Sequence, residues 1–187
     1  MRALLINPPR ENEIVGNNPA IIDEVRGHNP PLGILYIAAY LEARTKHEVS
    51  VLDCQVEGLD SAGVARRAAA LMPDVVGITA MTLCMVDVLD VVKAVKRSLP
   101  SATVVLGGPH VNLFPDETLN IEGVDLLVVG EGEQPFARLL DALEAGEGPG
   151  AVKGVVFKDS DGRVVNNGPP PLVVDLDSLP HPARHLG

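Results

Sequence analysis

Short β-branched runs alternate with longer segments of helical apolar spacing along most of this sequence, and this alternation is its strongest constraint on the fold. Such runs are typical of strands buried on both faces of a parallel sheet. Five strands are predicted, at residues 2–7, 48–54, 75–79, 103–106 and 125–129. Helices are predicted between or after them, at residues 31–44, 61–71, 86–99, 115–120 and 134–145.

This alternation predicts an α/β protein whose parallel sheet carries helices on both faces. Because crossovers between parallel strands are right-handed, few topologies remain. We expect a three-layer α/β/α, Rossmann-like (flavodoxin-like) fold with a five-stranded parallel sheet in the order 2-1-3-4-5. In such sheets, ligands bind at the carboxyl ends of the strands, here in a crevice between strands one and three.

The pattern changes after residue 150. Residues 154–158 and 163–166 flank the turn sequence Asp159-Ser160-Asp161-Gly162, which predicts a β-hairpin. The last twenty residues contain five prolines, a composition typical of linkers. We therefore expect a domain over residues 1–150, and over residues 151–187 a β-hairpin and a linker toward a domain that is absent here.

Composition excludes several functions. The net charge of −10 and the 3% aromatic content argue against nucleic-acid binding. No run reaches the ~18 apolar residues of a membrane span, and the N-terminus lacks the apolar segment of a signal peptide. The isolated Cys54 and Cys84 fit buried thiols in a reducing compartment. We expect a soluble, cytoplasmic protein without nucleic-acid or membrane partners.

Three loops are expected to meet at the carboxyl edge of the sheet, with Gly130 to Glu133 beside them: Asn7-Pro8-Pro9, Thr79 to Cys84, and Gly107 to Val111. The sequence contains no G-x-x-x-x-G-K-[ST] motif, and no G-x-G-x-x-G follows the first strand. Nor do the first and third strands end in the carboxylates of a phosphoacceptor domain. The small residues and free backbone of this edge favour a large, neutral ligand over catalysis. The long polar segment from Arg10 to Pro30 is functional or mobile in such a domain.

Other chemistries remain alternatives. Cys84 and His110 could form a nucleophile and base, although a packing role for Cys84 is favoured. Asp53 could hold a ribose hydroxyl or cap a turn, and the cap is favoured. The five histidines show no metal-ligand spacing on a helix, so no protein-built metal site is expected.

Five segments, in order, resemble the N-terminal cobalamin (B12)-binding domain of B12-dependent radical SAM enzymes. They are PPLGILYIAAYLE, PDVVGITAMT, VVLGGPHVNLFPDETL, VDLLVVGEGE and the linker-like DLDSLPHPARHLG. Cobalamin domains carry D-x-H-x-x-G after strand one, Ser-x-Leu after strand three and Gly-Gly after strand four. Gly107-Gly108 matches the last motif and Thr79-Ala80-Met81 loosely matches the second. The first is absent, so the resemblance implies base-off cobalamin without a lower histidine ligand, which only His28 or His110 could replace.

The resemblance implies that the nucleotide tail of cobalamin enters the crevice beside Gly107 and Gly108, where Thr79 can bind a phosphate or ribose. The corrin ring would lie against Pro8, Met81, Leu83 and Val111. Glu131 could bond a corrin amide, or cap the helix that follows. The implied cofactor-binding residues are Asn7, Pro8, Pro9, Thr79, Ala80, Met81, Thr82, Leu83, Gly107, Gly108, Pro109, His110, Val111, Gly130, Glu131 and Gly132.

The resemblance also implies a longer parent enzyme, a methyltransferase or a related C–C bond-forming or ring-forming catalyst, which uses a [4Fe-4S] cluster and S-adenosylmethionine. The C-x-x-x-C-x-x-C motif of that cluster is absent, so we expect this chain alone to bind and present cobalamin without turnover. The alternative is a degenerate domain that keeps the fold and acts as a non-binding scaffold or interaction surface.

Overall fold

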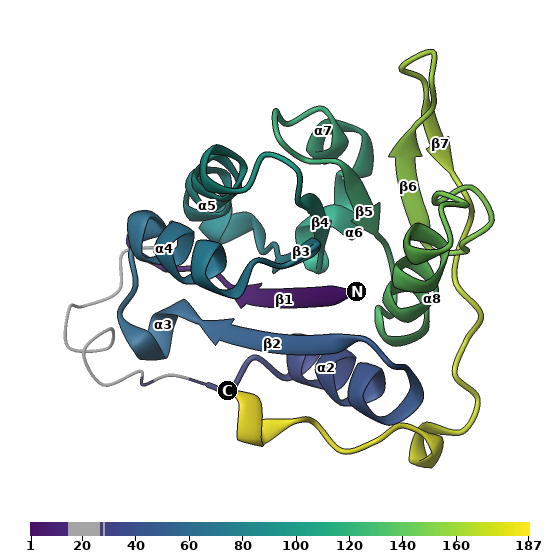
Figure 1. Cartoon of the computed structure of the whole chain (residues 1–187), viewed down its shortest axis with the longest axis horizontal. Coiled ribbons are helices and arrows are strands. Elements are labelled where there is room, and N and C mark those ends of the chain that lie inside the picture. The colour runs from purple at the N-terminus through teal and green to yellow at the C-terminus, as the bar shows by residue number, and fades with distance from the viewer. Residues whose placement is uncertain (15–26, 28) are drawn as a thin grey trace.

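The sheet has seven strands in the order β2-β1-β3-β4-β5-β6-β7 (Figure 1). The computed structural model describes residues 1–14, 27 and 29–187. The first five strands pair in parallel and confirm the predicted order 2-1-3-4-5. They are β1 (Arg2–Asn7), β2 (Glu48–Asp53), β3 (Val75–Thr79), β4 (Thr103–Gly107) and β5 (Leu126–Val128).

The five predicted parallel strands are confirmed, and the predicted C-terminal hairpin joins them to make a single seven-stranded sheet. Strand β6 (Val155–Lys158) pairs antiparallel with β5, with Val155 opposite Val128, and β7 (Val164–Asn166) pairs with β6. The hairpin was predicted, but its attachment was not, because sequence patterns do not show which strand a hairpin will pair with. The expected boundary at residue 150 lies between α8 (Glu133–Glu144) and β6.

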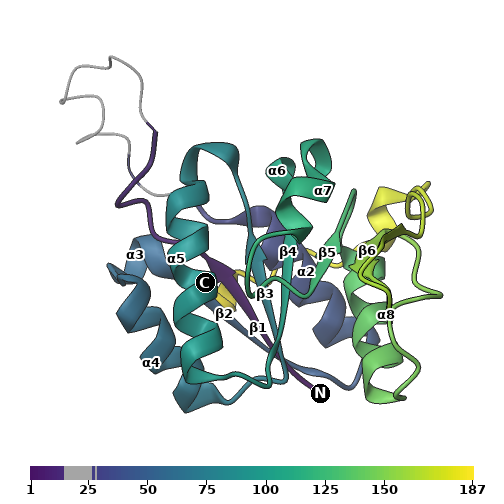
Figure 2. The same ribbon diagram turned by 90° about the horizontal axis from the view of Figure 1, so that it is seen from above.

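Helices cover both faces of the sheet (Figures 1 and 2). On one face lie α4 (Ser61–Leu71) and α5 (Met85–Ser98), and on the other lie α2 (Leu32–Arg44) and α8 (Glu133–Glu144). Helix α5 buries Val88, Val91, Val92 and Val95, the i, i+3, i+4, i+7 pattern of one helix face. None of the helices within the described residues is long and apolar enough to cross a membrane.

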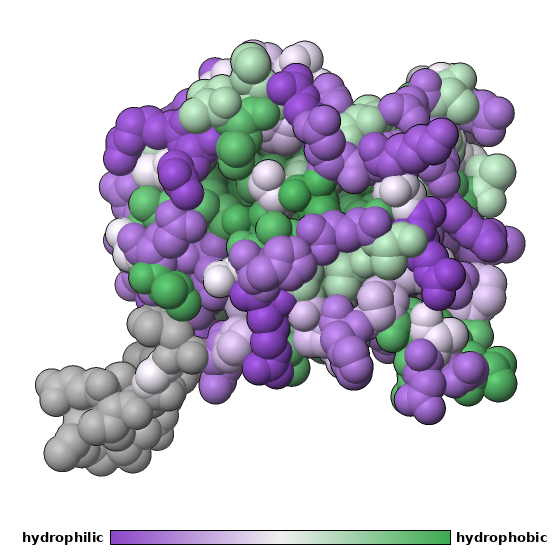
Figure 3. Space-filling view, turned by 60° about the horizontal axis from the view of Figure 1, so that its bottom comes forward, coloured by the Kyte–Doolittle hydropathy of each residue, from purple (hydrophilic) through white to green (hydrophobic). Residues whose placement is uncertain are grey.

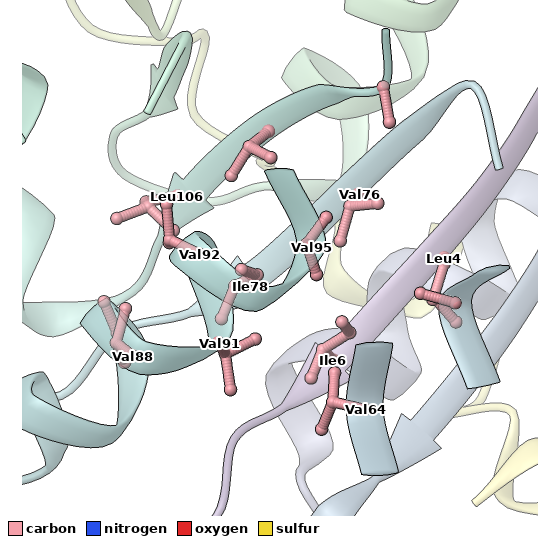
Figure 4. Close-up of a cluster of buried hydrophobic side chains, with 14 of the residues drawn as sticks. Leu4, Ile6, Val64, Val76, Ile78, Val88, Val91, Val92, Val95 and Leu106 are labelled. Carbon is pink, nitrogen blue, oxygen red and sulfur yellow. The ribbon is translucent and has the colours of Figure 1, made fainter. Parts of the chain in front are cut away.

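The two faces have separate cores. Between the sheet and α4/α5, the labelled side chains of Ile6, Val76, Ile78 and Leu106 pack with the valines of α5 (Figure 4). On the opposite face, α2 and α8 pack over a second cluster that includes Leu5, Val105 and Phe136. Adjacent strand residues alternate between these clusters, as the pleat of a strand requires.

Three short helices at the carboxyl edge were not predicted: α3 (Cys54–Glu57), the 3-10 turn η1 (Thr82–Cys84) and α6 (Pro109–Leu113). Helix α7 (Pro115–Leu119) was predicted. The missed elements have three to five residues, which is too short to show a helical apolar period. Proline at the first position of α6 suits a helix start, since the missing N–H has no acceptor there.

The loops after β3 and β4 are hydrogen-bonded to each other through their backbones. The Ala80 N–H donates to the Gly107 carbonyl at 2.7 Å, and the His110 N–H donates to the Ala80 carbonyl at 3.0 Å. Between them, Gly108 has φ +99°, and a Cβ atom there would lie 3.0 Å from the Ala80 carbonyl oxygen. Gly108 is therefore required by the fold itself.

The C-terminal segment runs back along α2 (Figure 1). The Ala183 N–H donates to the Leu35 carbonyl at 3.0 Å, and Arg44 Nη2 donates to the Ser178 carbonyl at 3.2 Å. His185 Nε2 lies 3.1 Å from Glu42 Oε1. The segment that composition identifies as a linker thus packs against the domain at its end, while Leu172 and Val174 stay exposed.

The substitution Gly108→Ala is expected to lower the free energy of unfolding by about 1–3 kcal/mol, because it adds a Cβ to a glycine-only conformation and against a carbonyl oxygen. Urea unfolding followed by circular dichroism measures the change. Gly107→Ala is the control, since its Cβ would meet only the Val128 carbonyl oxygen, at 3.5 Å. Equal stability of the two variants would contradict a structural role for Gly108.

Candidate functional site

A cavity of about 150 Å³ lies between the sheet and helices α2 and α8, at the carboxyl ends of the strands. Its walls are mostly apolar, with Leu5 and Val105 from the sheet, Ile34 and Ile37 from α2, and Phe136 from α8. Apolar cavities of about this volume hold a benzene-sized ring. The cavity lies on the α2/α8 side of the crevice at the carboxyl edge and suits part of an aromatic ligand.

The glycines that line this cavity are of two kinds. A Cβ at Gly77 would lie 2.8 Å from Leu5 Cδ2, and one at Gly132 would lie 2.7 Å from Ile37 Cδ1, so packing side chains already occupy the space beside both glycines. A Cβ at Gly33 would meet no atom within 4 Å, and one at Gly107 would meet only a carbonyl oxygen at 3.5 Å. The protein has no packing need for these last two glycines, and both keep space open beside the cavity.

Two helices begin at the mouth of the cavity. Gly33 and Ile34 belong to the first turn of α2, and Gly132 and Glu133 to the start of α8. The first backbone N–H groups of a helix have no acceptor within it, and the helix dipole favours negative charge there. The start of α2 therefore suits an anionic or hydrogen-bond-accepting part of a ligand. The start of α8 offers fewer donors, because the Glu133 N–H bonds its own carboxyl group and Pro135 has no N–H.

Glu133 brings a carboxyl group to this largely apolar cavity. Its side chain belongs to a residue only 8% exposed. Burial raises the pKa of this carboxyl, the charge of Glu131 raises it further, and a hydrogen bond from its own backbone N–H opposes both. The burial effect is the largest, so the site favours the protonated form more than water does.

Six of the residues predicted to bind a cofactor line the cavity. Thr79 and Gly107 lie opposite each other in the β3–β4 pairing, and their side-chain positions face α2 and α8. The other four are Gly108, Gly130, Glu131 and Gly132. The loops that carry them are joined, because Asn112 Oδ1 of α6 accepts the Gly130 N–H at 2.8 Å.

The other ten predicted residues do not line the cavity, and five of them are exposed or half-buried. Met81 and Leu83 are 47% and 46% exposed. Thr82 and Pro109 are also exposed, and His110 is half-buried. Pro8, Pro9, Ala80 and Val111 are buried, so Pro8 and Val111 present no side-chain surface for a corrin ring. Val111 is buried because α6, which was not predicted, turns this residue toward the core.

The Asn7 side chain is buried and hydrogen-bonded inside the protein. Its Nδ2 donates to Asp53 Oδ1 at 2.8 Å, and both residues are buried. Asp53 in turn accepts the Gln55 N–H and caps α3, which confirms the favoured interpretation of this residue. The pair ties the ends of β1 and β2 together.

The structure does not support a Cys84–His110 catalytic pair. His110 Nδ1 lies 3.1 Å from Thr82 Oγ1, and the His110 ring packs against Phe114 with 5.2 Å between centroids. Burial lowers the pKa of His110, while Cys84 is buried. His28, the other candidate for a lower ligand, lies outside the described residues.

Sequence reasoning did not identify several lining residues: Gly33, Ile37, Gly77 and Phe136. It placed Glu133 beside the carboxyl edge but gave it no role in binding. Gly33 carried a usable signal, since a glycine inside a helix costs about 1 kcal/mol relative to alanine and needs a reason. Apolar residues such as Ile37 and Phe136 carried none, because core and cavity side chains look alike in sequence. Among the described residues, no group of three or more His, Cys, Asp or Glu could hold a metal ion.

In space-filling view, apolar residues gather toward the middle of one face, within hydrophilic surroundings (Figure 3). The fold is a Rossmann-like α/β domain with a cavity at the carboxyl edge of its parallel sheet, the edge where ligands bind in such sheets. The chain belongs to the B12 binding domain family, whose model matches residues 19–140.

Two curated relatives extend this assignment. The chain is 36% identical over its full length to an uncharacterized methyltransferase, PH0819, from Pyrococcus horikoshii, and covers 39% of it. It is 31% identical over 160 residues to the anaerobic magnesium-protoporphyrin IX monomethyl ester cyclase of Rubrivivax gelatinosus. That match covers 83% of this chain and 29% of the cyclase. The chain thus spans about two fifths or less of these relatives.

Two solved structures share the fold. The radical S-adenosylmethionine methyltransferase TsrM from Kitasatospora setae, with cobalamin and a [4Fe-4S] cluster bound, matches with a TM-score of 0.73 and 21% identity. The match covers 96% of this chain and 31% of TsrM. The cobalamin-dependent enzyme OxsB with aqua-cobalamin bound matches with a TM-score of 0.76 and 18% identity, over 97% of this chain and 24% of OxsB.

The pH dependence of stability tests the environment of Glu133. Folding raises the pKa of the Glu133 carboxyl group above its ordinary value of 4.5. Its contribution to folding stability is therefore fully present below pH 4.5 and is lost as the pH rises through the raised pKa. Glu133→Gln should therefore match the wild-type protein at low pH and become progressively more stable than it toward neutral pH. Thermal unfolding from pH 4 to 8 measures this difference, with Glu122→Gln at an exposed position as the control. A difference that does not change with pH would contradict the account.

The reactivity of the two thiols tests the alternative of a catalytic cysteine. Burial, with the charges of Asp53 and Glu57, raises the pKa of Cys54 to about 12, and Cys84 is buried. We expect iodoacetamide at pH 8 to modify both cysteines slowly in the native protein and quickly after denaturation. Mass spectrometry of the alkylated protein gives both rates. Rapid modification of native Cys84 would restore the catalytic interpretation.

Proposed function

We propose that this chain binds cobalamin at the carboxyl edge of its sheet, with the nucleotide tail in the cavity between the sheet and helices α2 and α8. The observation that carries this proposal is the pair of glycines, Gly33 and Gly107, that leave space beside the cavity without a packing reason. Membership of the B12 binding domain family supports the choice of ligand.

The residues present fit such a tail. The apolar walls and Phe136 suit its heterocyclic base, and Thr79, half-buried at the cavity, offers a hydroxyl to a ribose or phosphate. The first turn of α2, at Gly33 and Ile34, brings backbone N–H groups to the rim, which favour the phosphate. These features support a base held away from cobalt, because the base would occupy the cavity.

The corrin ring would lie over the loops that follow β1, β3 and β4. Met81 and Leu83 offer exposed apolar surface there, and Leu113 and Phe114 at the end of α6 add to it. The loop after β1 carries no histidine up to residue 14, and His110 is hydrogen-bonded to Thr82. We therefore propose cobalamin in the base-off state without a lower histidine from this chain.

We further propose that the domain belongs to a longer B12-dependent radical SAM enzyme, a methyltransferase or a related catalyst. The printed names of PH0819 and of TsrM support this, as does the small share of each relative that the chain covers. The remainder of such an enzyme would supply the [4Fe-4S] cluster and bind S-adenosylmethionine, with its radical SAM domain as the intramolecular partner. Cobalamin would carry the transferable group, and the role of this domain is to hold and orient it.

Absorbance titration of the 187-residue protein with hydroxocobalamin and methylcobalamin tests the proposal. The wild-type protein should bind with a base-off spectrum. Gly107→Ala and Gly107→Val should weaken binding stepwise, by about tenfold or more for valine, because their side chains enter the space needed by the tail.

Gly150→Ala is the matched control, since Gly150 lies away from the cavity, has no atom within 4 Å of an added Cβ and lacks a positive φ. A base-on spectrum would contradict insertion of the tail. Absence of binding by the wild-type protein would contradict the proposal and favour the non-binding scaffold.

A further inference from the structure

The carboxyl group of Glu133 is the most unusual feature of the cavity. The residue is 8% exposed and lines a mainly apolar space. Within the described part of the chain, its carboxyl group accepts a hydrogen bond from its own backbone N–H. A carboxyl group has two oxygens with about four acceptor sites, so this one bond leaves capacity for a ligand.

No cation in the described structure compensates this carboxyl. The other titratable group that lines the cavity is Glu131, which has the same sign of charge. On α2, which packs against α8, Arg44 is bonded to the Ser178 carbonyl and Glu42 lies beside His185. On the side of β6, Lys153 donates to the Asn167 carbonyl. Tyr36 and Tyr40 of α2 are not among the lining residues.

The fold does not need an acid at this position. At neutral pH, its burial works against the charged form, whereas a glutamine of nearly equal size would carry no such penalty. A neutral carboxyl group, unlike a carboxylate, can donate a hydrogen bond as well as accept one. In its neutral form, this carboxyl group at the wall of the cavity is able to donate a hydrogen bond to a ring inside it.

We propose that the carboxyl group of Glu133 donates a hydrogen bond to a ring nitrogen of the heterocyclic base at the end of the cobalamin nucleotide tail, and so selects corrinoids that carry such a base. This inference rests on the proposed function. When the base is away from cobalt, its ring nitrogen is left without a partner and can accept a hydrogen bond. In this low-dielectric site, burying the ring nitrogen or the carboxyl group without a hydrogen bond would reduce the free energy gained on binding.

The test compares cobalamin with cobinamide, which has the corrin ring but lacks the nucleotide tail. Each corrinoid is titrated into the wild-type protein and into Glu133→Ala, Glu133→Gln and the exposed control Glu122→Gln, at pH 5.5 and pH 8.5. Dissociation constants come from absorbance, and circular dichroism shows whether each variant is folded. Glutamine keeps a donor at this position but cannot lose a proton.

We expect Glu133→Ala to weaken cobalamin binding by about tenfold at pH 5.5 and to leave cobinamide binding within about twofold. Glu133→Gln should bind cobalamin nearly as well as the wild-type protein at pH 5.5. Between pH 5.5 and 8.5 the wild-type protein should lose affinity for cobalamin, while Glu133→Gln should not. Cobinamide binding should be insensitive to both variant and pH.

Three results would overturn the inference while leaving the proposed function intact. The first is undiminished cobalamin binding by Glu133→Ala. The second is an equal loss for cobalamin and cobinamide, which would indicate an effect on the fold. The third is a wild-type pH profile that Glu133→Gln shares. If the wild-type protein binds neither corrinoid, the proposed function and this inference both fail.

Discussion

The site depends on the backbone contact between the loops that follow β3 and β4. Ala80 exchanges hydrogen bonds with both ends of the turn at Gly108, through the Gly107 carbonyl and the His110 N–H. Only glycine tolerates this approach at φ +99°. The contact sets where α6 begins, and through Asn112 of α6 it fixes the start of the β5–α8 loop. One close approach thus determines the positions of three loops around the cavity.

The two faces of the sheet differ because of side-chain alternation in β3 and β4. Ile78 and Leu106 point toward α4 and α5, where they fill a tightly packed core (Figure 4). Their neighbours Gly77 and Gly107 point toward α2 and α8 and leave that face under-filled near the carboxyl edge. Leu5 and Phe136 fill the space beside Gly77, whereas among the described residues only the Val128 carbonyl oxygen, at 3.5 Å, lies near a Cβ at Gly107. The cavity follows from this difference.

Much of the parallel sheet could be predicted because each buried strand leaves a β-branched run and each long helix leaves an apolar period, as in Val75–Thr79 and Met85–Ser98. The turn at Gly107-Gly108 could be predicted because two glycines directly follow a buried strand. The short α6 and the pairing of β6 with β5 could not, because they depend on contacts between segments distant in sequence. Glu133 was overlooked for the same reason, since only the fold shows that it is buried and that Glu131 is exposed.

The central claim is that the space beside Gly107 receives the nucleotide tail of cobalamin. A crystal structure of the protein with bound cobalamin tests it most directly. The account predicts electron density for the base between the sheet and helices α2 and α8, close to Phe136 and Glu133, with no base on cobalt. Density for the base on cobalt, or a tail lying outside an empty cavity, would contradict the account.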